Sequence, residues 1–262
     1  MSFSHENLHV YQRILAFNAR IGVDIEHWDK RHSICDHLPR AATSVVENIA
    51  MGSAAYSNMK VKSLDYAVGS MLECAACLDI ASVKKLLSEG SIIGFKGELC
   101  ELLKMLIGLR RRWVQQEVRE DQEDYANAHC SEEDSPSRER SGSDRPMFHH
   151  EGLDVYRVAL SVFDLLSSSA SVQNLRSAVF RRLDVLATST VLNIAEGNGR
   201  FSILDQKRFL CTAHESAVKL TTRLDLCVVQ GQLPKEEATL MKNRLSRVSP
   251  MTSAMITESA PR

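Results

Sequence analysis

The chain is poor in residues that break helices and in residues that favour strands. Its 262 residues include only 12 glycines and 6 prolines, and aromatic side chains make up 6% of the composition. Sheets need many tight turns, usually built with glycine or proline, and their strands are enriched in aromatic and β-branched side chains. Helices need neither. The composition therefore predicts an all-α protein, long enough for two domains that each bury a core.

Export and membrane signals are also missing. Residues 1–6 contain no basic segment followed by an apolar run, and no window approaches about 18 uninterrupted apolar residues. The seven cysteines are an odd number, and most fall in amphipathic helical patterns, where a free thiol packs as a small apolar group. We therefore expect a soluble protein in the reducing cytoplasm, with no membrane span. The cysteines in helical patterns are Cys74, Cys77, Cys100, Cys211 and Cys227.

Net charge is nearly absent, at −1, but the charges are unevenly distributed. Residues 119–150 hold four arginines against nine acidic residues, a balance of −5. Residues 1–118 hold 14 basic and 13 acidic groups, and residues 151–262 hold 14 and 11. The two flanking segments are thus mildly basic, which permits a polyanionic partner without requiring one.

What the sequence does contain is a tandem repeat. Residues 43–52, TSVVENIAMG, return as residues 188–197, TSTVLNIAEG, with seven identities at an offset of 145. The opening Leu8-x-Val10-Tyr11 returns at the same offset as Leu153-x-Val155-Tyr156, and later pieces agree at an offset of 146. Chance explains such agreement poorly. We conclude that the chain is a duplication, with one residue inserted in the second copy.

Apolar periodicity predicts four helices in each copy, and four amphipathic helices with short connections can close into an antiparallel up-down bundle. Gly90 is expected to stop the third helix, and Pro250 to limit the last. The predicted ranges are 7–26, 33 or 36–50, 57 or 58–90 and 97–119 in copy one, and 153–167, 172–196, 203–230 and 234–248 in copy two.

The stretch between the copies is acidic and serine-rich and has no apolar periodicity, so we predict a flexible linker. His149 and His150, at its end, are interpreted as polar residues. The predicted domains are a four-helix bundle over residues 1–118, a linker over 119–150 and a second bundle over 151–262.

Patterns for catalysis and metal binding are sparse. A carboxylate metal centre in a bundle uses Glu-x-x-His on two helices, whereas Glu6-x-x-His9 occurs once and has no counterpart in copy two. Cys74-Ala-Ala-Cys77 has a redox-like spacing but lies in a helical pattern without a second pair, so we interpret it as two residues packed on one helix face. We predict that the protein is not an enzyme and holds no metal or cofactor.

The repeated Asn-Ile-Ala motif has an architectural interpretation. Asn48 and Asn193 each follow a serine by four residues, so their amides can hydrogen-bond to that helix turn or across the bundle. Small residues after the motif allow the next helix to approach closely. The motif residues are Ser44, Asn48, Gly52, Ser189, Asn193, Glu196, Gly197 and Gly199.

The two copies have drifted in complementary ways. Copy one keeps Arg40-Ala-Ala before its serine, where copy two has residues 184–187, Asp-Val-Leu-Ala. Copy two in turn keeps Glu196, Gly199 and Arg200, at positions where residues 51, 54 and 55 of copy one are Met, Ala and Ala. We therefore expect the two halves to have different roles.

Clusters of basic residues are the remaining functional signal. Lys and Arg contacts to phosphate provide affinity without sequence specificity, although each cluster is also explained as a solvated helix face. Trp113, beside an arginine run, fits either a core position or stacking on a base. The candidate nucleic-acid-binding residues are Arg110, Arg111, Arg112, Lys104, Arg181, Arg182, Arg200, Lys207, Arg208 and Arg40.

The string NIAEGNGR at residues 193–200, with the Leu-x-Val-Tyr opening before it, resembles a family of four-helix-bundle proteins. That family comprises proteins of ribosomal-RNA intervening sequences and the accessory variability proteins of diversity-generating retroelements. The resemblance covers both copies and omits the linker. It implies a scaffold that assembles into a ring, binds RNA or DNA and helps a reverse transcriptase copy a template RNA during targeted mutagenesis.

A second hypothesis is a purely structural, self-associating bundle protein of the intervening-sequence type without significant nucleic-acid binding. The near-neutral overall charge favours it. Single-copy relatives are expected to form pentamers, and a covalent pair changes that stoichiometry. Both hypotheses predict a homo-oligomer.

Overall fold

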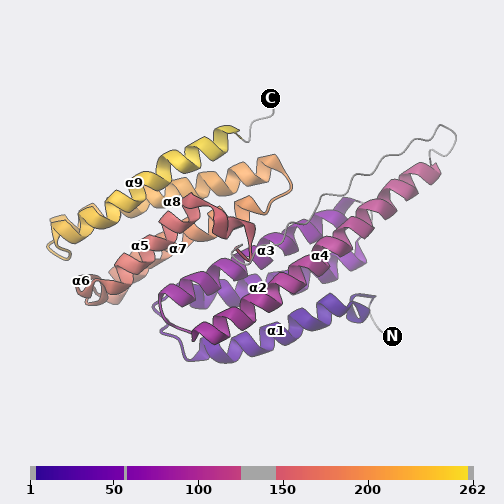
Figure 1. The fold of residues 1–262 in the computed structure, drawn as a ribbon, viewed down its shortest axis with the longest axis horizontal. Coiled ribbons are helices and arrows are strands. Elements are labelled where there is room, and N and C mark those ends of the chain that lie inside the picture. The colour runs from indigo at the N-terminus through magenta and orange to yellow at the C-terminus, as the bar shows by residue number, and fades with distance from the viewer. Residues whose placement is uncertain (1–3, 56–57, 125–145, 259–262) are drawn as a thin grey trace.

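The computed structural model describes residues 4–55, 58–124 and 146–258, and every regular element within these ranges is a helix. The helices form two bundles that lie side by side (Figure 1). The predicted all-α fold is confirmed.

Copy one is a closed bundle of four helices preceded by the short 3-10 helix η1 (Ser4–Asn7). Each helix packs on the next in the chain, and the fourth returns to the first. Apolar residues at helical spacing face inward, among them Ile14, Phe17, Leu38 and Leu102, all of which are fully buried. The helices are α1 (His9–Glu26), α2 (Ile34–Ala54), α3 (Asn58–Val83) and α4 (Glu89–Asp124).

Copy two repeats this plan. Helices α5, α7, α8 and α9 correspond to α1, α2, α3 and α4, and they pack around a core in the same cyclic order. A short extra helix, α6, follows α5. The elements are η2 (His149–Gly152), α5 (Asp154–Ser168), α6 (Ala170–Gln173), α7 (Ser177–Asn198), α8 (Ile203–Val229) and α9 (Lys235–Glu258).

The predicted boundary between the third and fourth helices of copy one is wrong, and α2 continues to Ala54, four residues beyond its predicted end. Helix α3 ends at Val83 rather than at Gly90, because Lys85 adopts a φ of 55°, in the left-handed region that cannot continue a right-handed helix. Gly90 instead lies in the first turn of α4, which begins at Glu89 rather than at Gly97.

Copy two shows one confirmed helix end and two corrections. Gly231 follows α8 with a φ of 67°, as a helix stop requires. Pro250 does not end the last helix but lies inside α9, on its exposed side. The predicted helix 172–196 is divided, because α6 and α7 are separate elements.

The segment predicted as a linker is shorter than expected. Helix α4 continues through residues 119–124, and residues 146–150 are already part of copy two. His150, interpreted as a polar residue at the end of the linker, is instead fully buried in the protein. Residues 125–145 lie outside the described residues.

Helix α3 is the central helix of the molecule. It packs against α2 and α4 in its own copy and against α5 and α7 of the other. Its segment Met59–Val83 is long and apolar enough to cross a membrane, with a mean hydropathy of 1.4. However, 72% of its most apolar 18-residue window is buried inside the protein. Burial on every side explains a helix that is apolar all round.

The cysteines differ in how they pack. Cys74 and Cys77 are completely buried on α3, and burial raises the pKa of both thiols well above the usual value. Cys227 is also buried, whereas Cys100 is half-buried. Cys211 is exposed, so the expectation that it packs as a core residue is wrong.

Candidate functional site

The strongest concentration of buried polar residues lies where the two copies dock, which we call the junction. There α3 of copy one packs against α7 and α5 of copy two. Helices α3 and α7 run antiparallel, since Gly69 lies against Arg200 at one end and Lys84 against Asp184 at the other. The third helix of one copy thus docks on the first and second helices of the other, so the two surfaces are unlike.

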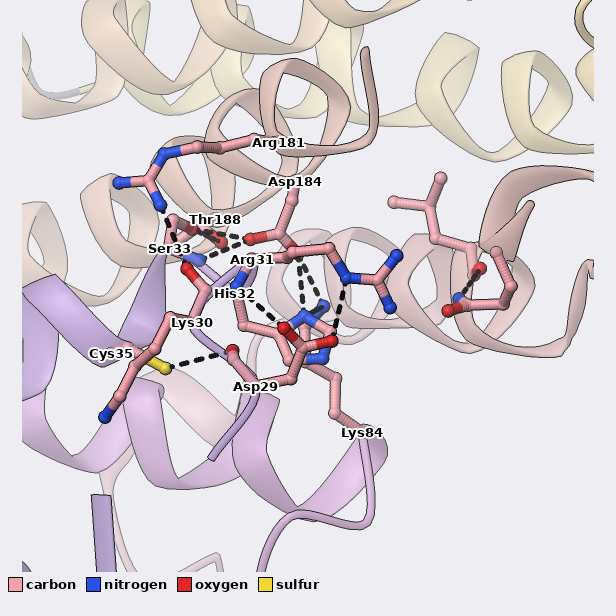
Figure 2. Close-up of polar contacts among 12 residues, drawn as sticks. Asp29, Lys30, Arg31, His32, Ser33, Cys35, Lys84, Arg181, Asp184 and Thr188 are labelled. Carbon is pink, nitrogen blue, oxygen red and sulfur yellow. Dashed lines mark hydrogen bonds and ion pairs between the residues drawn. The ribbon is translucent and has the colours of Figure 1, made fainter. Parts of the chain in front are cut away.

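Asp184 is the centre of the first polar cluster (Figure 2). Its side chain is 2% exposed, and its carboxylate lies 2.5 Å from Lys84 Nζ, whose side chain is 3% exposed. The backbone N–H of Ser33 donates to Asp184 Oδ2 at 2.6 Å, and the Ser33 hydroxyl lies 2.8 Å from both Asp184 Oδ2 and Thr188 Oγ1. One buried ion pair and a hydrogen-bond network therefore hold α7 against copy one.

The environment of Asp184 keeps it ionised. Burial by itself raises the pKa of a carboxyl group, but here His32, Lys84 and the Ser33 N–H together hold the pKa of Asp184 well below its usual range. Because Lys84 is equally buried, neither charge is compensated by water. The pair links α7 of copy two to the residue that follows α3 in copy one.

The second polar cluster lies between α3, α4, η2 and α5. Lys96 Nζ lies 2.6 Å from Asp79 Oδ1 and 2.7 Å from Glu151 Oε1, and Tyr156 donates its hydroxyl to Asp79 Oδ2 at 2.9 Å. Among the described residues, Asp79, His150 and Glu151 are close enough together to hold a metal ion. The Lys96 ammonium, however, already lies within hydrogen-bond distance of both carboxylates, so it would compete with any cation.

His150 is the unusual member of this cluster. Both of its ring nitrogens are buried and have no hydrogen-bond partner. The ring packs against Phe148, 5.8 Å away, and edge-on against Tyr156, 4.7 Å away. Burial, with smaller effects from the charges of Lys96 and His149, lowers the pKa of His150 to about 3. The imidazole is therefore neutral at neutral pH and packs as an aromatic residue.

The third cluster surrounds Arg200, which follows α7. Its side chain is 6% exposed and forms an ion pair with Glu196. The guanidinium carbon lies 4.5 Å from the Phe209 ring centre and 5.4 Å from that of Tyr66. A Cβ on Gly69 would lie 2.6 Å from the same carbon, so only glycine leaves room for Arg200 on α3. Arg200, a candidate for nucleic-acid binding, is instead largely enclosed by the junction.

An open pocket of about 400 Å³ adjoins this third cluster. Each copy contributes to this pocket a motif residue that the other copy has lost. Arg40 comes from copy one, whereas Glu196 and Arg200 come from copy two. Burial, together with the charge of Glu73, raises the pKa of Glu196 to about 7, against the opposing effect of Arg200. The complementary drift of the two copies therefore corresponds to one composite pocket at the junction.

The repeated motif makes the same hydrogen bonds in both copies. The amide of Asn48 donates to Ser44 O at 2.8 Å, and that of Asn193 donates to Ser189 O at 2.7 Å. Both serines also contact a serine on the next helix: Ser44 lies 2.9 Å from Ser70, and Ser189 lies 2.8 Å from Ser216. These bonds join the second and third helices within each bundle.

The motif glycines are close-contact points between helices. A Cβ on Gly52 would lie 2.8 Å from the ring of Trp113, which is a core residue with 7% exposure. Of the two interpretations of Trp113, the core position is confirmed. Gly197 faces Phe209 in the same way, and Gly199 faces Leu72 across the junction.

One contact joins the basic run of α4 to the segment that leads into α8. Arg110 pairs with Asp65 at 2.5 Å and stacks over the ring of Phe201, 3.9 Å away. Phe201 is 49% exposed and leads into α8, whose first turns carry two further cations. We call this region the basic α4 surface; it comprises Lys104, Arg110, Arg111, Arg112, Phe201, Lys207 and Arg208.

The remaining candidates lie elsewhere. Arg181 reaches across the junction, pairing with Asp36 at 2.6 Å and donating to Lys30 O at 3.0 Å. Arg182 is exposed beside it, at the opposite end of α7 from Arg200. Arg40 is exposed and contacts His37 at 2.8 Å. The ten basic candidates therefore do not form a single site.

A comparison with protein families identifies both copies. The profile of the family described as 23S rRNA-intervening sequence protein matches residues 6–108 and 155–254. The chain belongs to this family. No curated protein and no solved structure matches it. The two matched segments are the two copies, so this member of the 23S rRNA-intervening sequence protein family is a tandem duplication.

Sequence reasoning missed three junction residues of this family member. Nothing in the sequence around Lys84 marks it as buried, and His150 was interpreted as a polar residue at the end of the linker. Asp184 carried a weak sequence signal of a buried charge. It is charged where copy one has Pro39, and its neighbours in the sequence are apolar. A comparison of the copies position by position was the only available way to find it.

Proposed function

We propose that the chain is a non-enzymatic scaffold that binds RNA or DNA at the basic α4 surface and assists the reverse transcriptase of a diversity-generating retroelement. The observation that carries the proposal is the contact of Arg110 with the exposed ring of Phe201, which places the basic run of α4 next to the segment that leads into α8. The reverse-transcriptase partner and its template RNA come from the family resemblance.

The composition of this surface suits single-stranded nucleic acid. Lys104 and Arg111 are seven residues apart on α4 and therefore share one helix face, with Arg112 beside them. Cations of this kind contact phosphates, and an exposed aromatic ring can stack on a base, worth about 1–3 kcal/mol per base. Binding of this type is tolerant of sequence and sensitive to salt.

The buried titratable groups favour a scaffold over an enzyme. Asp184 of copy two pairs with Lys84 of copy one, and Arg200, which pairs with Glu196 of its own copy, packs against Gly69 of α3. These groups are used to hold two bundles together. A reacting centre needs a nucleophile, a base and an orienting group around a place for substrate, and we assign no such set here.

The test is binding of a labelled 20-nucleotide RNA to the full chain across a salt series. Arg111 and Arg112 are the residues to change, because Arg110 also pairs with Asp65 and its loss would perturb folding. R111E/R112E should weaken binding at least tenfold and reduce the salt slope by about 1–2, since each lost phosphate contact removes about 0.7–0.9 from it.

The matched control reverses two exposed arginines of α9, R244E/R247E, and α9 belongs to the second bundle whereas α4 belongs to the first (Figure 1). This variant changes the net charge by the same amount as R111E/R112E, and its RNA affinity should stay within about twofold of the wild-type value. Equal losses in both variants would show a nonspecific effect of charge, and no loss in either would reject the basic α4 surface. Co-purification of a reverse transcriptase encoded beside this chain tests the partner.

The second candidate function is a purely structural, self-associating scaffold, which a repeated set of contacts favours. The Asp79–Lys96 pair recurs in copy two as Asp225–Lys242, at 2.5 Å. The ring contact of His150 with Tyr156 recurs in copy one as His5 with Tyr11, at the same centroid distance of 4.7 Å. At the junction, the Asp–Lys pair of copy one meets the His–Tyr contact of copy two. The second Asp–Lys pair lies in copy two and the second His–Tyr contact lies in copy one, both away from the junction.

The outer face of α8 has the apolar character of a docking surface. Val218 and Leu226 are 46% and 41% exposed, and they correspond to Leu72 and Ile80, which the junction buries. The α8 face of one chain is thus suited to the α1–α2 face of the next. Repeated docking of unlike faces gives closed rings or open filaments.

Light scattering tests this candidate directly. Self-association should give a mass that is a multiple of 29.3 kDa, and Leu226→Asp should lower it. Leu240→Asp, at a similarly exposed position on α9, should not. A wild-type chain that is monomeric at tens of micromolar would reject the proposal, whereas an oligomer without RNA affinity would favour the structural role over the accessory role.

A further inference from the structure

A groove on copy two, between α7 and α8, combines an apolar floor with a rim of positive charge. Its volume is about 520 Å³. Its apolar lining residues, which we call the floor, are Ala178, Val185 and Leu186, and Val185 is 37% exposed. Its cationic lining residues, which we call the rim, are Arg181, Arg182, Lys219 and Arg223.

The corresponding positions in copy one have the opposite electrostatic character. The repeat offsets of 145 and 146 align the four rim residues with Asp36, His37, Glu73 and Cys77. In copy one, His37 and Glu73 contact each other at 3.2 Å and so bridge α2 and α3. Their counterparts, Arg182 and Lys219, are both cations and cannot form this bridge.

Four like charges around one groove raise its energy unless anions lie nearby. Two rim residues have acidic partners: Arg181 pairs with Asp36 at 2.6 Å, and Lys219 pairs with Glu215 at 3.2 Å. All four of these side chains are about half exposed or more, so the pairs are weak. Four rim cations with two acidic partners leave the groove an excess of two positive charges.

We propose that this groove binds an acidic amphipathic helix of a partner protein. Carboxylates of such a helix would pair with the rim, while its apolar side chains would cover Val185 and Leu186, as in other helix-in-groove complexes. A nucleic acid would satisfy the rim but leave the floor uncovered, because the described residues that line the groove include no aromatic ring for base stacking.

The groove is separate from the basic α4 surface and goes beyond the proposed function. It lies beside residues 181–186, near the start of α7, whereas Arg200 and Phe201 follow the end of that helix. At 1.5 Å per residue, the two regions are roughly 25–30 Å apart along the helix axis. One scaffold can therefore hold a protein partner and a nucleic acid at the same time.

The experiment is a fluorescence-anisotropy titration of the full chain with a labelled 16-residue helical peptide that carries leucines on one face and glutamates elsewhere. A second peptide has glutamine in place of every glutamate, and an oligo(dT) of 16 nucleotides serves as competitor. The variants are R182E/R223E for the rim, Val185→Ser for the floor and R244E/R247E as the charge-matched control. Circular dichroism and thermal melting confirm that each variant is folded.

The glutamate peptide should bind with micromolar affinity, and the glutamine peptide at least tenfold more weakly. R182E/R223E should weaken binding at least tenfold and Val185→Ser about threefold, with the control unchanged. Absence of peptide binding would overturn the proposal. Equal competition by oligo(dT), with Val185→Ser as tight as wild type, would also overturn it and would assign the groove to phosphate binding.

Discussion

Asp184→Ala should destabilise the folded chain by about 3–5 kcal/mol, because it leaves the Lys84 ammonium buried without its carboxylate. The Lys84 side chain is only 3% exposed, so water cannot replace the lost partner. The backbone N–H of Ser33 would lose its acceptor as well. The loss should therefore fall in the upper part of that range.

A second ion pair across the same junction provides the control. Asp36 and Arg181 also join the two copies, but their side chains are 63% and 47% exposed. Asp36→Ala should cost no more than about 1 kcal/mol, because both charges remain solvated. The two variants remove the same chemical group from the same interface and differ chiefly in burial.

Urea unfolding followed by two probes measures the effect. Both tryptophans, Trp28 and Trp113, belong to copy one, so their fluorescence reports on that bundle, whereas circular dichroism reports on both. If the junction couples the copies, Asp184→Ala, a change in copy two, should also shift the fluorescence transition. Equal costs for the two variants, or a cost below about 1 kcal/mol for Asp184→Ala, would refute the reasoning.

A paired replacement and the pH dependence sharpen the same test. Asp184→Leu combined with Lys84→Met removes both charges and should recover most of the lost stability. Because the pKa of Asp184 is held below its unfolded value, its contribution is present above about pH 4 and disappears as the pH falls. Asp184→Ala should therefore flatten the acid limb of the stability curve.

Three further predictions concern the other two clusters. Gly69→Ala should cost about 1–3 kcal/mol in urea unfolding by displacing buried Arg200, whereas Gly22→Ala, where a Cβ meets nothing within 4 Å, should be neutral or stabilising; equal effects would contradict this. His150→Phe should keep or raise the melting temperature and, because the pKa of His150 is lowered to about 3, remove a loss of stability that begins as the pH falls below about 6.5; an unchanged slope would contradict this. Glu196, with its pKa raised to about 7, should make stability fall as the pH rises from about 4.5 to 7, and Glu196→Gln should flatten that limb if this carboxyl group is responsible.

Much of the fold was predictable because it depends on local patterns. The repeat and the helical periodicity gave two four-helix copies, and helices such as α5 and α8 begin and end within one residue of the predicted ranges. The misplaced ends have local causes that a pattern does not reveal. Lys85 took the left-handed conformation that Gly90 was expected to provide, and α9 tolerates Pro250.

The junction was not predictable, because it depends on which faces of two bundles fit each other. Arg200 and Arg181 looked like parts of solvated basic clusters, yet one is enclosed by α3 and the other pairs with Asp36, 145 residues away. A sequence does not show which distant carboxylate or glycine an arginine will meet. The complementary drift of the copies was the one sequence signal of the composite pocket, and it acquired a meaning only once that pocket was seen.

The covalent connection between the copies has a consequence for how the junction could evolve. Two separate bundles would dock only above a threshold concentration, whereas tethered bundles see each other at an effective concentration that does not depend on how much protein is made. Each copy then needs to preserve only the face that meets its sister. The outward faces need not keep the polar contacts of the junction, and there Met51, Ala55 and Gln230 stand in place of Glu196, Arg200 and Lys84.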